Sequence, residues 1–90
     1  MQNFINIQLF SINKLIFHGE LISINLRTDR SAYITLLPNH SPLITNLTDS
    51  KISLHLNRGK TQFFNVETGV FYFADNKAYL IANKATLMNK

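Results

Sequence analysis

The sequence contains no cysteine, no tryptophan and only three glycines among its 90 residues. The lack of cysteine excludes disulfides and thiolate metal sites, and three glycines are too few for a glycine-rich phosphate-binding loop. No apolar run approaches the roughly 18 residues that a membrane-spanning helix needs. The N-terminus also lacks the pattern of a secretion signal. We therefore expect a soluble cytoplasmic domain without direct membrane insertion.

Charged side chains are sparse, and the acidic ones number only five: Glu20, Asp29, Asp49, Glu67 and Asp75. The three aspartates lie at expected turns, where Asp accepts hydrogen bonds from nearby backbone N–H groups. A catalytic pair of carboxyls must face one cleft, and nothing in the sequence brings two together. The nine Lys and Arg are scattered, unlike the clustered basic patch of nucleic-acid-binding proteins. We expect neither carboxylate catalysis nor a nucleic-acid partner.

The three histidines, His18, His40 and His55, match no local metal-binding spacing. No G-x-S-x-G nucleophile motif is present. His55 alternates with apolar residues, so we expect it to face solvent. The sequence therefore predicts no metal, no cofactor and no catalytic centre; a catalytic alternative would rest on His40 alone.

Apolar and polar residues alternate with a period of two in three segments. This is the pattern of strands with one buried face. The apolar positions expected to be buried are Ile5, Ile7 and Leu9; Ile22, Ile24 and Leu26; and Ile52, Leu54 and Leu56.

Turn signals separate these segments. Arg58-Gly59 predicts a tight hairpin turn before a strand over Gln62–Val66, since Gly59 can adopt a positive φ. Asp75 to Lys77 predicts a second turn between strands. Strands thus recur at intervals typical of an all-β sandwich or barrel. We predict one such domain over residues 1–86 and a frayed tail over residues 87–90.

The segment VFYFA, Val70 to Ala74, is apolar at every position. A strand with this composition is covered on both faces. The cover would come either from a central place in the fold or from a partner.

The segment LPNHSPLIT, Leu37 to Thr45, contains both prolines of the chain. Each proline fixes its own φ and favours extended geometry in the residue before it. The segment is therefore stiff. It could be a plain crossover between sheets or a preorganised docking surface, since rigid loops lose less entropy on binding. The pattern alone leaves both interpretations open.

This segment resembles the P-G-H-A-P-L-L-T-type segment of the epsilon subunit of F-type ATP synthase, which is called delta in mitochondria. Upstream, NIQLFSINKLIFHGELISINL is similar to the family's opening strand, Phe-x-Gly turn and second strand. Downstream, FFNVETGVFYFADNKAYLIANKA is similar to its S-G-G-containing strand and closing strand. The resemblance spans residues 4 to 86.

The resemblance implies a small sandwich of two antiparallel sheets that acts as a non-catalytic rotor subunit of the central stalk. Such a subunit docks on the gamma subunit and links it to the polar loops of the membrane c-ring. It is peripheral, on the cytoplasmic side of the membrane. Family members usually continue into a C-terminal helical hairpin, which the sequence printed here does not include, so only the sandwich domain is implied.

Site residues follow from the same resemblance. The residues that it places at the gamma interface are His40, Ser41, Pro42, Leu43, Thr45, Glu67 and Thr68. The loop that it turns towards the ring consists of Arg27, Thr28, Asp29, Arg30 and Ser31. We expect the gamma contact to centre on Leu43 and Ile44, with His40 as a polar anchor, and Leu43→Asp to weaken it without unfolding the domain.

Three departures from the family pattern stand out. The acidic, glycine-containing loop before the P-G-H segment is replaced by RTDRSAYITLL, so that Arg, Ser, Ala and Tyr stand at acidic and glycine positions of the expected ring-facing loop. Asn39 replaces glycine, although Asn also adopts the left-handed conformation. Of the S-G-G motif, only Gly69 is kept. The alternative to a rotor subunit is a stand-alone β-sandwich module that binds a small ligand or an extended peptide.

Overall fold

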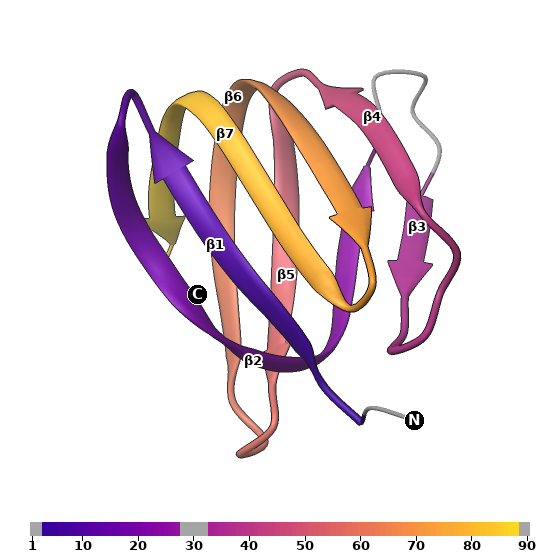
Figure 1. The fold of residues 1–90 in the computed structure, drawn as a ribbon. Coiled ribbons are helices and arrows are strands. Elements are labelled where there is room, and N and C mark those ends of the chain that lie inside the picture. The colour runs from indigo at the N-terminus through magenta and orange to yellow at the C-terminus, as the bar shows by residue number, and fades with distance from the viewer. Residues whose placement is uncertain (1–2, 28–32, 89–90) are drawn as a thin grey trace.

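The computed structural model describes residues 3–27 and 33–88, and the regular structure in these ranges is all strand. The strands are β1 (Ile5–Ser11), β2 (Lys14–Arg27), β3 (Tyr33–Leu36), β4 (Leu43–Leu47), β5 (Ser50–Leu56), β6 (Thr61–Ala74) and β7 (Lys77–Met88) (Figure 1). The predicted all-β sandwich is confirmed. β7 includes Leu87 and Met88, which the sequence analysis places in the tail.

Two long strands, β2 and β6, hold the two layers together because each contributes to both. β6 pairs with β5 along its first half and with β4 along its second half. β2 pairs first with β1 and then with β5 and β3. β7 completes one layer between β1 and β6 (Figure 1). The pairs are antiparallel as expected except that β1 and β7 are parallel.

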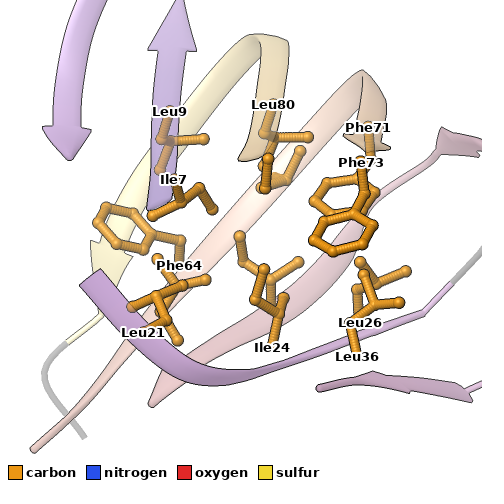
Figure 2. Close-up of a cluster of buried hydrophobic side chains, with 14 of the residues drawn as sticks. Ile7, Leu9, Leu21, Ile24, Leu26, Leu36, Phe64, Phe71, Phe73 and Leu80 are labelled. Carbon is orange, nitrogen blue, oxygen red and sulfur yellow. The ribbon is translucent and has the colours of Figure 1, made fainter. Parts of the chain in front are cut away.

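The core lies between the layers and follows most of the predicted alternation. The first predicted triplet, Ile5 to Leu9, is buried, as are Ile24, Leu26, Ile52 and Leu54, whereas Leu56 is half-buried. Figure 2 shows Ile7, Leu9 and Leu80 from one layer facing Leu21, Ile24 and Leu26 of β2. Phe71 and Phe73 fill the end of the core that is nearest Leu26 and Leu36.

The prediction for Ile22 is wrong. Its side chain is 45% exposed. The pairing of β2 with β5 shifts between Leu21 and Ser23, which marks a β-bulge. A bulge adds one residue to one strand and so changes which side chains face inward. The inward series therefore passes from Leu21 to Ile24 and skips Ile22.

The turns agree with the prediction. Gly59 has a φ of 86°, and the Leu56 N–H donates to the Lys60 carbonyl at 2.8 Å, closing the β5–β6 hairpin. Asp75 and Asn76 connect β6 to β7 with φ values of 52° and 61°. Two consecutive positive φ angles are typical of a type I′ hairpin turn.

β6 is one continuous strand where the sequence suggested two, and Gly69 lies at the junction. A Cβ added at Gly69 would lie 3.0 Å from the Ile81 carbonyl oxygen and 3.2 Å from the Ala82 Cβ. A side chain at Gly69 would therefore force its neighbours to move by a few tenths of an ångström, and glycine avoids this displacement. The preceding residue, Thr68, has a φ of 50°, which is strained for a β-branched side chain.

We predict that Thr68→Asn raises the free energy of unfolding by about 1 kcal/mol, because Asn tolerates the left-handed conformation better than Thr. Urea denaturation followed by circular dichroism measures the change. Thr48→Asn is the matched control, since Thr48 is exposed and is not among the positive-φ residues. Equal stability of wild type and Thr68→Asn would show that this φ stores no strain.

Candidate docking face

An apolar surface covers the outer side of the layer formed by β4, β6, β7 and β1. The strand register aligns Ile44, Tyr72, Tyr79 and Gln8 in one row across the four strands. The next row contains Asn46, Val70, Ile81 and Phe10. We call these eight residues the apolar face. None of them is charged.

Four large side chains of the apolar face are exposed. The exposed fractions are 68% for Ile44, 58% for Ile81, 46% for Val70 and 41% for Tyr72. The Tyr72 and Tyr79 rings lie side by side, with centroids 6.2 Å apart. Contiguous exposed apolar patches on small domains mark interaction sites. Such a surface can bind a protein by excluding water.

The VFYFA segment is explained by this arrangement. Phe71 and Phe73 are buried in the core, whereas Val70 and Tyr72 point outward. The sequence suggested cover either by the rest of the fold or by a partner. The rest of the fold covers only the side of the strand that carries Phe71 and Phe73.

The loop before β4 is fixed by a pair of asparagines. Asn39 has a φ of 72°, so it adopts the left-handed conformation expected at this position. Its backbone N–H donates to the Asn76 Oδ1, and the Asn76 Nδ2 donates to the Asn39 Oδ1 at 3.0 Å. Asn76 is buried and its carbonyl also accepts the Asn6 N–H at 2.9 Å. The loop is thus tied to both the β6–β7 turn and β1.

His40 is exposed and lies beside this pair. Its Nδ1 is 2.7 Å from the Ser41 carbonyl oxygen, and its ring meets the Phe73 ring edge-on with centroids 6.2 Å apart. Because a carbonyl only accepts hydrogen bonds, Nδ1 carries the hydrogen in this contact. The Nε2 atom makes no contact of this kind with Ser41 and is the ring nitrogen that suits a polar contact with a partner.

His55 lies on the outward side of β5, as the alternation predicted, but it is half-buried rather than fully exposed. Its ring nitrogens lie 3.0 Å from the Asn25 Nδ2 and 3.0 Å from the Thr61 Oγ1. Thr35 donates to the Asn25 Oδ1 at 2.9 Å. These residues form a polar ladder across β3, β2, β5 and β6. Within residues 3–27 and 33–88, no three His, Asp or Glu side chains gather into a possible metal site.

A family model describes almost the whole chain. The model for the β-sandwich domain of the ATP synthase delta/epsilon chain matches residues 4–88. The chain belongs to the ATP synthase delta/epsilon family. It contains the family's β-sandwich domain, as the resemblance implied.

Curated relatives agree with this assignment. The ATP synthase epsilon chain of Streptomyces avermitilis is 29% identical over 86 residues, which are 96% of this chain and 68% of the relative. The epsilon chain of Streptomyces griseus is 28% identical over the same shares of both chains. The expected family is therefore confirmed, which favours a subunit of a rotary ATP synthase over a stand-alone binding module.

Solved structures share the fold. A chain in the mitochondrial ATP synthase of Euglena gracilis, in a structure of OSCP, F1 and the c-ring, superposes with a TM-score of 0.89 at 16% identity. A chain in the central stalk and c-ring of the Tetrahymena thermophila enzyme superposes with a TM-score of 0.73 at 16% identity. The matches cover 97% and 93% of this chain but only 55% and 66% of those chains.

The residues that the family resemblance placed at the gamma interface border the apolar face at both ends. Ser41 and Pro42 are exposed at the start of β4, next to His40. Glu67 and Thr68 are exposed at the far end of the β4–β6 pair, beyond Gly69. The predicted residues thus lie at the rims of this surface and Ile44 lies within it, while their contact with gamma stays a prediction. The residues of β1 and β7 were not predicted, because their proximity depends on the strand register.

Leu43 and Thr45 are less exposed than Ile44. Both are half-buried, and Leu43 packs against the core. This packing argues against the expectation that Leu43→Asp leaves the domain folded, because a carboxylate at this position would lie against the core. Ile44, which points outward, is the position that tests this surface.

The expected ring-facing loop lies mostly outside the described residues. This applies to Thr28, Asp29, Arg30 and Ser31. Arg27 is described: it is exposed and its guanidinium lies 5.4 Å from the centre of the Tyr33 ring. In the described part of the chain, no helix is long and apolar enough to span a membrane.

We predict that Asn76→Ala lowers the free energy of unfolding by about 2–3 kcal/mol, through loss of the Asn39 hydrogen bonds and strain at its positive φ. Asn76→Gly removes the same amide but tolerates the φ of 61°, so its loss should be smaller. Urea denaturation measures both. The exposed Asn83→Ala is the control and should change stability by less than about 0.5 kcal/mol. A loss for Asn76→Ala no larger than the control would contradict the role of this pair.

Proposed function

We propose that this chain is a non-catalytic domain of the central stalk of an F-type or F-type-like rotary ATPase, and that it docks on the gamma subunit through the apolar face. The observation that carries the proposal is the combination of family membership with a charge-free, exposed apolar surface on four strands. The expected gamma-facing residues border this surface.

The side chains of the apolar face suit stable binding to a protein rather than catalysis. Its six larger apolar side chains are Phe10, Ile44, Val70, Tyr72, Tyr79 and Ile81. Aromatic side chains are enriched at protein interfaces, and charged ones are depleted at interface cores. Removal of these side chains from water supplies binding free energy in proportion to the apolar area buried. No charged pair has to be desolvated in the two rows.

A rotor domain must transmit torque without deforming. The Asn39–Asn76 pair fixes the loop carrying His40, and the two prolines restrict the chain on either side. A preorganised surface of this kind loses little conformational entropy when it binds. We place the domain peripherally, on the cytoplasmic side of the membrane, with the end carrying Arg27 towards the polar loops of the c-ring.

We predict that Ile44→Glu weakens binding to the gamma subunit at least about tenfold, because it places a charge at the centre of an apolar contact. Co-purification with gamma from cells producing the complex, followed by titration of the purified partners, measures the loss. The isolated domain should keep its stability within about 0.5 kcal/mol, since Ile44 is a surface residue.

Ile22→Glu is the matched control. Ile22 is also an exposed isoleucine, in the β2 bulge and outside the apolar face, and its substitution should leave gamma binding unchanged. Unaltered gamma binding by Ile44→Glu would rule out this face as the docking site. Equal weakening by both variants would indicate a general loss of folding or solubility instead.

A further inference from the structure

A cleft opens on the other layer of the sandwich, where β2 and β5 separate. The two strands pair from Leu21–Leu56 to Asn25–Ser53. Beyond this point, Leu26 and Arg27 pair only with β3, and Ser50 to Ile52 pair only with β6. The space between them has a volume of about 600 Å³, which is within the range of roughly 300–1,000 Å³ found for ligand pockets.

The walls of the cleft are strand edges. A strand without a neighbour presents a row of backbone N–H and C=O groups that can pair with an added chain. Here two such edges, at Leu26–Arg27 and at Ser50–Lys51, face the same space. An extended peptide that entered between them would find backbone partners on both sides, which is strand addition.

The basic side chains that line the cleft favour an acidic peptide. Arg27 lies on one wall and Lys51 on the other, and both are exposed. The Arg27 guanidinium is held over the Tyr33 ring, which also lines the cleft. Asp49 is the carboxylate among the described lining residues, so two cations and one anion line the described part of the cleft. The remaining polar lining is neutral amide and hydroxyl, which suits a peptide backbone.

A buried hydroxyl at the same site has no partner among the described residues. Ser50 is 3% exposed and lines the cleft, and its Oγ makes no hydrogen bond there. A buried polar group without a partner costs about 1–3 kcal/mol. A peptide amide that entered the cleft would be in a position to remove this penalty.

We propose that the cleft between β2 and β5 binds an extended acidic protein segment as an added strand. Its carboxylates pair with Arg27 and Lys51, and its backbone pairs with the two facing edges. The site lies outside the apolar face, and the proposal does not rest on docking to gamma.

The test uses the full chain and a fluorescein-labelled hexapeptide, Thr-Glu-Val-Glu-Val-Thr, blocked at both ends. Glutamates two residues apart lie on the same face of a strand. Two matched peptides separate the contribution of the carboxylates from that of backbone pairing. One has Gln in place of both Glu, and the other is N-methylated at alternate backbone amides. Fluorescence anisotropy measures the Kd of each.

We expect saturable binding of the acidic peptide, and binding at least tenfold weaker for the Gln peptide and for the N-methylated peptide. Arg27→Gln and Lys51→Gln should each raise the Kd about tenfold, which is 1.4 kcal/mol. Lys84→Gln, at an exposed lysine outside the cleft, should leave the Kd unchanged. Ile44→Glu should also bind the peptide normally, even if it loses gamma.

Ser50→Ala adds a readout that a purely structural serine would not give. It should stabilise the free domain, by removing an unpartnered hydroxyl, and at the same time weaken peptide binding. Three results would overturn the proposal: no saturable binding, equal binding of the Glu and Gln peptides, or no effect of Arg27→Gln and Lys51→Gln. Full binding of the N-methylated peptide would show that the cleft holds a carboxylate without strand addition, and would also overturn it.

Discussion

The close contact between the backbones of β6 and β7 at Gly69 is the constraint on which the rest of the sandwich depends. A Cβ at this position would lie 3.0 Å from the Ile81 carbonyl oxygen, which is an unusually tight contact, so glycine lets β6 continue from the layer of β5 to the layer of β4 without displacing β7. The continuity fixes the inward position of Phe71 and Phe73 and the outward position of Val70 and Tyr72. Both the core and the apolar face therefore rest on the same residue, with strain left at Thr68.

The two outer surfaces of the domain differ in chemistry, and the difference separates their roles. The apolar face has no charged side chain in its two rows, so its affinity depends on buried area and should respond weakly to salt. The opposite surface carries the Thr35–Asn25–His55–Thr61 ladder and the cations Arg27 and Lys51. Contacts there depend on hydrogen bonds and charge, so they favour selectivity and are screened by salt. One domain can thus hold one partner firmly while it meets another through exchangeable contacts.

Local patterns predicted the parts of the fold that local chemistry decides. The alternation of Ile5, Ile7 and Leu9 and the positive φ of Gly59 needed only strand periodicity and turn chemistry. Ile22 could not be placed because a bulge is a property of the pairing between strands. The difference between Leu43 and Ile44 is one step of the pleat, which depends on register. The apolar face could not be assembled from sequence either, because it combines four strands from different parts of the chain.

The departures from the family pattern fall into two kinds, and the structure separates them. Asn39 stands where the family has glycine, yet it adopts the left-handed conformation and gains the reciprocal bonds with Asn76. Geometry is preserved there, and the bordering surface keeps its apolar character. The segment that starts at Arg27 has instead exchanged acidic and glycine positions for Arg, Ser, Ala and Tyr. A change in the sign of charge cannot be compensated inside the domain, because it alters what an opposing surface must carry. Asn39 therefore keeps the backbone geometry of its loop, whereas the exchanges after Arg27 change the chemistry that an opposing surface has to match.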